Sequence, residues 1–196
     1  MIREFHESLR YDYPDLTPAS VVLDCGGFEG NFAKTINARY GCRVVVYEPI
    51  LEFFIGTQMA VKRNPDISVM HSAVGASNRR ENFGVKGDQT GVMCSGNRTE
   101  NVLVMDIVLA LTACLRDYKA TQIALLKLNV EGMEFEVMER ILDAGLADKI
   151  VHFQIQPHNI VPDAESRWQR IMDRLAETHE VDYYAPWVWF GATLRK

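Results

Sequence analysis

The chain has 196 residues, of which 47% are hydrophobic and 24% charged, values that suit one globular domain spanning residues 1–196. Its formal net charge is -5 and its lysines and arginines form no stripe. We therefore expect no nucleic acid among its partners, because phosphate binding depends on clustered positive charge. No stretch is long and apolar enough to cross a bilayer, and the charged first ten residues lack a signal-peptide pattern. These features predict a cytoplasmic protein with no membrane partner.

The cysteines are widely separated in the sequence and form no C-x-x-C pair. They stand at Cys25, Cys42, Cys94 and Cys114. We expect reduced thiols in the interior of the domain rather than disulfides or a zinc site.

Apolar residues in the first half alternate between strand and helix periods. Ile2, Phe5 and Leu9 suggest a small N-terminal helix. The pattern then predicts strands over 21–25, 43–47 and 67–70, and helices over 31–40 and 51–63. A glycine-rich region follows, and we expect it to add a small extra hairpin near 82–98.

The same alternation continues in the second half of the chain. It predicts strands over 101–105, 123–128 and 149–155, helices over 107–118 and 133–143 with Asp106 as an N-cap, and a last helix around Trp168. Strands over 181–185 and 187–195 follow, and their short connection requires an antiparallel pair. The sequence thus predicts an α/β fold, with a doubly wound, mostly parallel Rossmann-like sheet that ends in an antiparallel C-terminal strand pair.

The most informative segment follows the first predicted strand and runs from Asp24 through Gly26, Gly27, Phe28 and Gly30 to Asn31. In open α/β sheets ligands bind at the carboxyl ends of the strands, and glycines let the backbone come close to a ligand. The spacing G-G-x-x-G differs from the dinucleotide pattern G-x-G-x-x-G. An aspartate at this place repels a pyrophosphate and attracts an ammonium group. The pattern D-x-G-x-x-x-G resembles the first motif of the Rossmann-like methyltransferases.

Two further segments fit a nucleoside. Glu48 and Pro49 end the second predicted strand, and a carboxylate there accepts hydrogen bonds from both ribose hydroxyls. The third strand leads to Ser72 and Ala73, where we expect the adenine, with Ser72 bonding to its edge. Each signal alone is equally consistent with a tight turn or a solvated strand end, but their order along the chain favours a nucleotide-type site.

Residues Leu126–Glu134 read L-K-L-N-V-E-G-M-E and resemble the K-I-D-V-E-G-x-E hallmark of the FkbM family of methyltransferases. The segments 73–75 and 104–106, Phe83, and the C-terminal tryptophans Trp187 and Trp189 are also similar to that family. The resemblance runs from about residue 21 to 196. It implies S-adenosylmethionine as the cofactor and O-methylation of a hydroxyl on a sugar, a glycan or a natural product. Asn129 replaces the family's aspartate, and Gln156 stands where the family has an acid in E-x-H.

An alkyl hydroxyl is a poor nucleophile until it loses its proton, so a base is expected near the acceptor. The candidates for the catalytic site are His158, Glu131, Asn129 and Lys127. His158 is equally consistent with a surface loop histidine, and Glu131 with an acid that favours a helix N-terminus. For Lys127, inside a buried strand, we favour a structural ion pair with Glu131, Glu134 or Asp106. Asn129 is expected to face the cofactor or the acceptor, and no ligand spacing demands a metal.

Two alternatives of other classes remain open at this stage. The departures at Asn129 and Gln156 fit a non-catalytic binding module that keeps the fold. A nicotinamide-dependent oxidoreductase is the other alternative, although the glycine spacing and the terminal antiparallel pair disfavour it.

Overall fold

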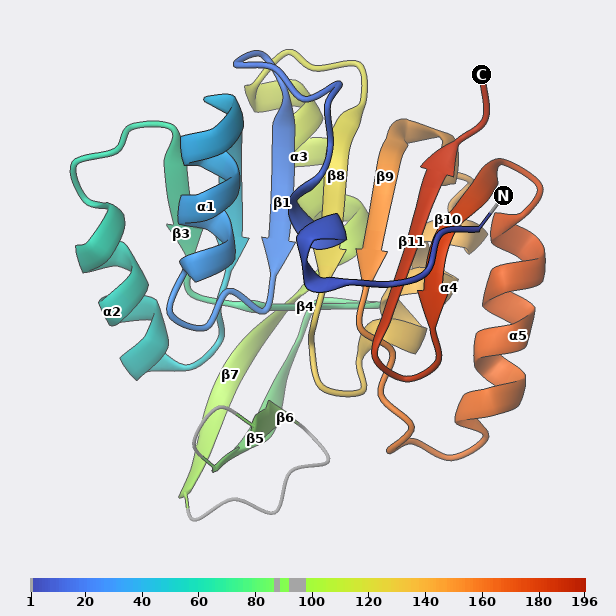
Figure 1. The fold of residues 1–196 in the computed structure, drawn as a ribbon. Helices are drawn as coiled ribbons and strands as arrows, with labels where there is room; N and C mark the ends of the chain where they lie inside the picture. The colour runs from blue at the N-terminus through green and yellow to red at the C-terminus, as the bar shows by residue number, and fades with distance from the viewer. Residues whose placement is uncertain (1, 87–88, 92–97) are drawn as a thin grey trace.

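A seven-stranded sheet forms the centre of the protein in the computed structural model, which describes residues 2–86, 89–91 and 98–196 (Figure 1). The strand order is β10-β11-β9-β8-β1-β2-β3. The strands are β1 (Val21–Cys25), β2 (Arg43–Tyr47), β3 (Ile67–Met70), β8 (Ile123–Leu128), β9 (Ile150–Ile155), β10 (His179–Ala185) and β11 (Trp189–Leu194). All neighbouring strands are parallel except β11, which runs antiparallel to both β9 and β10. The predicted fold class is therefore confirmed.

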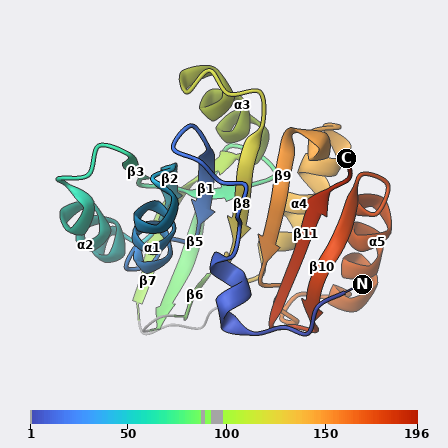
Figure 2. The same cartoon turned by 45° about the horizontal axis from the view of Figure 1, so that its top comes forward.

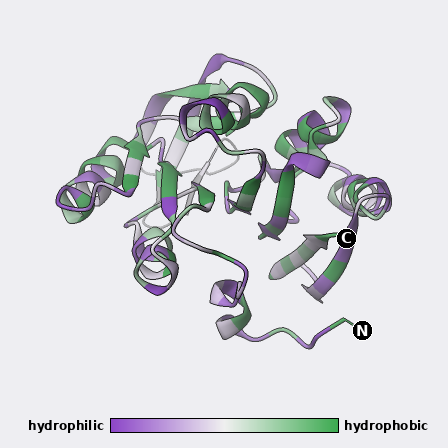
Figure 3. Ribbon diagram, turned by 90° about the horizontal axis from the view of Figure 1, so that it is seen from above, coloured by the Kyte–Doolittle hydropathy of each residue, from purple (hydrophilic) through white to green (hydrophobic). Residues whose placement is uncertain are grey.

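Helices cover both faces of this sheet. They are α1 (Asn31–Tyr40), α2 (Leu51–Val61), α3 (Ile107–Asp117), α4 (Glu134–Asp143) and α5 (Ala164–Leu175). Side chains of α3, α4 and α5 form one core cluster with the strands, and α1 forms another with Tyr13 and Leu16 of the N-terminal segment. Figure 3 shows mainly hydrophobic residues on the strands, and both hydrophobic and hydrophilic residues on the helices. The sheet is thus buried on both faces, as its nearly continuous apolar strands require.

The N-terminal segment packs against the C-terminal strand pair. It contains a short 3₁₀ helix, Glu7–Tyr11, and Leu9 packs beside Tyr183 and Trp189. The backbone amide of Arg3 donates to the carbonyl oxygen of Asp182 at 2.7 Å. Figures 1 and 2 show this segment crossing in front of β10 and β11. Both ends of the chain therefore lie at one side of the sheet.

A second sheet projects from the central one and is larger than the expected hairpin. It has the order β4-β7-β5-β6, with β4 (Ala73–Gly75), β5 (Arg79–Lys86), β6 (Gln89–Gly91) and β7 (Arg98–Asp106). The predicted strand 101–105 belongs to β7, which pairs with β5 and β4 instead of joining the central sheet. Part of the predicted hairpin at 82–98 lies outside the described residues. Residues 79–85 pair with residues 98–104, which are distant in sequence. This pairing makes both strands longer than the apolar pattern of either segment predicts.

The Asp106 carboxylate accepts the Val108 amide at 2.9 Å, which confirms the N-cap of α3. Cys25, Cys42 and Cys114 are buried free thiols, while Cys94 lies outside the described residues. Within residues 2–86, 89–91 and 98–196, no helix has the length and apolar character needed to cross a membrane.

Candidate functional site

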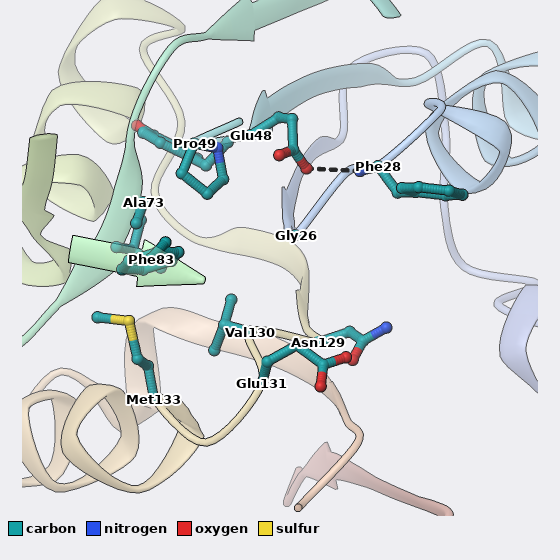
Figure 4. A pocket seen from close by; sticks show the side chains of 12 residues that line it. Gly26, Phe28, Glu48, Pro49, Ala73, Phe83, Asn129, Val130, Glu131 and Met133 are labelled. Atoms are coloured by element: carbon teal, nitrogen blue, oxygen red, sulfur yellow. Dashed lines mark hydrogen bonds between the residues drawn. The ribbon is translucent and has the colours of Figure 1, made fainter. Parts of the chain in front are cut away.

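A cavity with about 500 Å³ of empty space, part of it open to solvent, lies at the carboxyl ends of β1, β2 and β8. In Figure 4, Glu48 and Phe28 are separated from Asn129, Val130 and Glu131 by the cavity. The second sheet contributes Phe83 and Ala73 to its wall. The lining residues are Gly26, Phe28, Tyr47, Glu48, Pro49, Ala73, Val74, Phe83, Asn129, Val130, Glu131 and Met133. The cavity therefore lies where ligands of open α/β sheets bind.

Glu48 is a buried carboxylate in the wall of this cavity, with only 3% of its surface exposed. One oxygen accepts the backbone amide of Phe28 at 2.7 Å, and the other accepts the amide of Ile50 at 2.9 Å. Burial raises the pKa of Glu48 to about 7, because the two amide bonds offset only part of the desolvation. Each oxygen retains a second lone pair, so the carboxylate can still accept hydroxyl donors from a ligand.

The glycine turn after β1 is needed mainly for packing within the protein. Gly26 has a φ of +82°, and a β-carbon there would overlap the carbonyl oxygen of Asn129. A β-carbon on Gly27 would collide with Val46, and one on Gly30 would lie 2.6 Å from Thr57. The glycines therefore let the turn approach β8, β2 and α2, which line and support the cavity. Gly26 itself lines the cavity, and a close approach of this turn to a ligand stays a prediction.

Asp24 does not line the cavity. It is completely buried on β1 and forms an ion pair with Lys127 of β8, with 2.8 Å between Oδ1 and Nζ. The Lys127 ammonium also donates to the carbonyl oxygen of Gly26 at 2.7 Å. The expected structural ion pair of Lys127 thus exists, but its partner is Asp24 rather than Glu131, Glu134 or Asp106. Lys127 thus supplies the counter-charge of the buried Asp24, and a contact between Asp24 and the ammonium group of a ligand stays a prediction.

Asn129 begins the loop between β8 and α4 and lines the cavity. Its backbone amide donates to the carbonyl oxygen of Cys25 at 3.0 Å, which ties this loop to the turn after β1. Its side-chain oxygen is buried and accepts no hydrogen bond from any described residue. A buried polar atom without a partner is unfavourable, so this oxygen is a candidate acceptor for a ligand donor.

Across the loop, an imidazole lies between two carboxylates. His158 Nδ1 lies 3.0 Å from Glu134 Oε1, and His158 Nε2 lies 3.5 Å from Glu131 Oε1. Burial alone would lower the pKa of His158, but the hydrogen bond to Glu134 and the charges of Glu134 and Glu131 raise it above 6.5. The pair of acids therefore favours an imidazolium, which is a poor base. Glu131, which lines the cavity, is the better candidate to accept a proton.

Glu134 fixes the conformation of this loop. Its carboxylate is completely buried and accepts the backbone amides of Val130 at 2.7 Å and Gly132 at 2.8 Å. Glu131 between them has a φ of +53°, a left-handed conformation that is unfavourable for a side-chain-bearing residue. Such strain persists where the surroundings enforce it, often at functional sites. Glu134 was not predicted as a site residue, because an acid in the first turn of a helix has an ordinary explanation in the helix dipole.

The other predicted site residues lie behind or beside the cavity wall. Gly30 is the N-cap of α1, and Asn31 is exposed at the first position of that helix. Ser72 is buried next to the lining residue Ala73, and its hydroxyl has no hydrogen-bond partner among the described residues. The sequence did not point to Tyr47, Val74, Val130 and Met133 as lining residues, because apolar side chains there are indistinguishable from core.

The structure offers no direct support for a metal centre. Asp106 forms an ion pair with Arg140 at 2.8 Å and caps α3. Across the part of the chain that the structure describes, no three acidic, histidine or cysteine side chains gather closely enough to hold an ion.

Solved structures with the same fold are class I methyltransferases, at very low sequence identity. An rRNA methylase from Streptococcus thermophilus is 10% identical with a TM-score of 0.56, over 100% of this chain and 98% of that one. Precorrin-6y C5,15-methyltransferase from Geobacter metallireducens is 7% identical with a TM-score of 0.53, over 100% and 94%. A candidate methyltransferase from Streptococcus mutans, in complex with S-adenosylhomocysteine, is 9% identical with a TM-score of 0.51, over 90% and 88%. No protein-family model and no curated protein matches this sequence.

These structures correct the expectation that nucleic acid is excluded as a partner. Several proteins with this fold are described as rRNA methylases, including the one from Streptococcus thermophilus. The exclusion relied on the net charge of -5 and the lack of a basic stripe. Net charge describes the whole surface, whereas binding of a nucleic acid depends on the local field at the contact. The fold of this chain is that of the class I methyltransferases.

The buried ion pair predicts a large effect on stability. Lys127→Met leaves the Asp24 carboxylate buried without a counter-charge, and we expect it to lower the free energy of unfolding by about 3–5 kcal/mol. The double variant Asp24→Asn with Lys127→Met removes both charges and should recover much of this loss. Urea unfolding at pH 7 measures both.

The matched control is Lys149→Met, because Lys149 pairs with Asp148 at 3.8 Å with about half of each side chain exposed. Exposed pairs of this kind contribute roughly 0–1 kcal/mol. Equal losses for Lys127→Met and Lys149→Met would contradict the role assigned to the buried pair.

Proposed function

We propose that this protein is an S-adenosylmethionine-dependent methyltransferase, formed by one domain spanning residues 1–196, and that it methylates a hydroxyl group. The observation that carries the proposal is the buried Glu48 carboxylate in the cavity wall, at the end of β2. A ribose offers two neighbouring hydroxyl donors to such a carboxylate. The class I methyltransferase fold and the bound S-adenosylhomocysteine in one solved structure of that fold support this interpretation.

The residues around the cavity suit the parts of this cofactor. Glu48 would hold the ribose hydroxyls, and the unpaired side-chain oxygen of Asn129 would accept a hydrogen bond from the ammonium group. Pro49, Ala73 and Phe83 provide apolar surface for the adenine. Asp24, Gly26, Gly27, Gly30 and Asn31 would shape the turn that carries Phe28, and Ser72 would support the adenine side. Lys127 then acts through Asp24 and Gly26 as a positioning residue.

The chemistry requires a nucleophilic oxygen in line with the transferable methyl group. S-adenosylmethionine supplies that methyl group in electrophilic form. Glu131 would accept the proton of the acceptor hydroxyl, and His158 and Glu134 would hold the Glu131 loop in its strained conformation. Because positioning supplies much of the acceleration in such displacements, the rigidity of this loop is part of the mechanism.

The resemblance to the FkbM family favours a hydroxyl on a sugar, a glycan or a natural product as the acceptor. RNA is the second candidate acceptor, because other proteins of this fold are described as rRNA methylases. Methyl transfer to a panel containing neutral saccharides and ribosomal RNA fragments distinguishes the two. A non-catalytic module would bind the cofactor without turnover, and a nicotinamide-dependent oxidoreductase would bind NAD instead.

Cofactor binding should depend on Glu48 and on pH. Calorimetric titration with S-adenosylhomocysteine is expected to show binding that NAD does not, and Glu48→Ala should weaken it by at least about tenfold. The raised pKa of Glu48, about 7, means that the proton must leave before the carboxylate accepts both hydroxyls. Affinity should therefore rise by about tenfold between pH 6 and pH 8.

Glu48→Gln is the matched control for this pH dependence, since it keeps the size of the side chain and cannot titrate. The other charged groups near the cavity, Lys127, Asp24, Glu131 and His158, are unchanged in it. A pH dependence that persists in Glu48→Gln, or an affinity unchanged in Glu48→Ala, would refute the ribose assignment.

Turnover should depend on Glu131 much more than cofactor binding does. Glu131→Gln keeps the shape of the loop but removes the proton acceptor, and we expect kcat for methyl transfer to fall by about 10² or more. The dissociation constant for S-adenosylhomocysteine should change less than about threefold. Transfer of a labelled methyl group to the acceptor measures the first quantity. Full activity of Glu131→Gln would rule out Glu131 as the base while leaving the cofactor site intact.

A further inference from the structure

Helix α2 carries an exposed apolar stripe. Leu51, Ile55 and Met59 follow one another at four-residue intervals, and their exposed fractions are 48%, 45% and 63%. Residues four apart lie on the same face of a helix, so these side chains form one continuous ridge. Figure 1 places α2 beside β3, the edge strand at one end of the central sheet.

The opposite face of α2 is already packed. Thr57 and Val61 are buried, and the ring of Phe53 lies 4.5 Å from that of Phe28. Of the five α-helices, α2 has the most apolar sequence, and its apolar residues point to both sides. An apolar side of a helix is normally buried against another element. In a single copy of the chain only one side of α2 is covered by the described residues.

Gly56 gives an independent indication on the same exposed side. It is exposed in the middle of the helix, and a β-carbon built on it meets no atom within 4 Å. Nothing in one copy requires a glycine there, and glycine weakens a helix relative to alanine. One turn later stands the small residue Ala60. Small residues at such positions let the backbone of a second helix approach closely.

The charges at the two ends of the stripe differ in sign. Glu52, 67% exposed, lies at the start of the helix. Arg98 forms ion pairs with both Glu52 and Glu100, so this group of three side chains keeps one net negative charge. Lys62 and Arg63 lie at its end, and neither has an ion-pair partner among the residues described. In an antiparallel pair of α2 helices, Glu52 lies opposite Lys62 of the partner subunit, and Ile55 opposite Met59 of the partner subunit.

We propose that α2 is the interface of a two-fold symmetric homodimer. A two-fold axis brings identical surfaces together, so the surface must complement itself. The α2 surface does so, with an apolar centre and opposite charges at its two ends. This inference does not depend on the proposed function, because the interface residues lie outside the lining of the cavity.

Sedimentation velocity of the full chain, over a range from micromolar to about 100 µM, tests the proposal. We expect the wild-type protein to sediment as a dimer, and Ile55→Glu to raise the dimer dissociation constant by at least about tenfold. The matched control is Leu109→Glu, because Leu109 on α3 is 52% exposed and outside the stripe. It should leave the dimer unchanged, and thermal melts verify that both variants fold.

A charge swap tests the antiparallel arrangement directly. Glu52→Lys and Lys62→Glu should each weaken the dimer, because like charges then meet across the axis. The double variant loses the Glu52–Arg98 pair as Glu52→Lys does, but it should dimerise more tightly than that single variant, because opposite charges meet again across the axis with their positions exchanged. A wild-type monomer at all concentrations, equal disruption by Leu109→Glu, or no recovery in the double variant would overturn the proposal.

Discussion

The burial of one carboxylate organises the site. Glu48 directly follows β2 and connects the turn after β1 to the start of α2, because its oxygens accept the amide of Phe28, 20 residues away, and that of Ile50, two residues on. Desolvating a carboxylate is costly, and the pKa of about 7 expresses that cost. Glu48 thus holds a hydrogen-bond acceptor in the cavity wall, where its two oxygens can each accept one further donor.

The other charged side chains of the site are paired with one another rather than with Glu48. Lys127 neutralises Asp24 below the cavity, and His158 lies between Glu131 and Glu134 on the far side. Each of these charged groups also forms hydrogen bonds to the backbone. Lys127 donates to the carbonyl oxygen of Gly26, and Glu134 accepts the amides of two loop residues. The ionic groups therefore set the shape of both walls, and the neutral side chain of Asn129 is left to face the cavity.

The periodicity of the sequence was sufficient to predict the strands of the central sheet and the helices that cover it. Each of these elements buries one or both of its faces, and the buried residues appear in the sequence as an apolar pattern of strand or helix period. The second sheet was underestimated because β7 finds its partner in β5 through long-range pairing, which leaves no local signal. In the site, the positions of Glu48 and Asn129 followed from motifs at strand ends. The pairing of Asp24 with Lys127 depends on the register between β1 and β8, and the bridging role of Glu134 depends on loop conformation. Neither is encoded by spacing along the chain.

The most direct measurement is a crystal structure of the protein grown with S-adenosylhomocysteine. We expect both ribose hydroxyls to lie within hydrogen-bond distance of the Glu48 carboxylate, with the hydrogen bonds from the Phe28 and Ile50 amides retained. We also expect the amino group of S-adenosylhomocysteine to lie beside the side-chain oxygen of Asn129. A nucleoside bound away from Glu48, or no binding at millimolar concentration, would contradict the role assigned to Glu48.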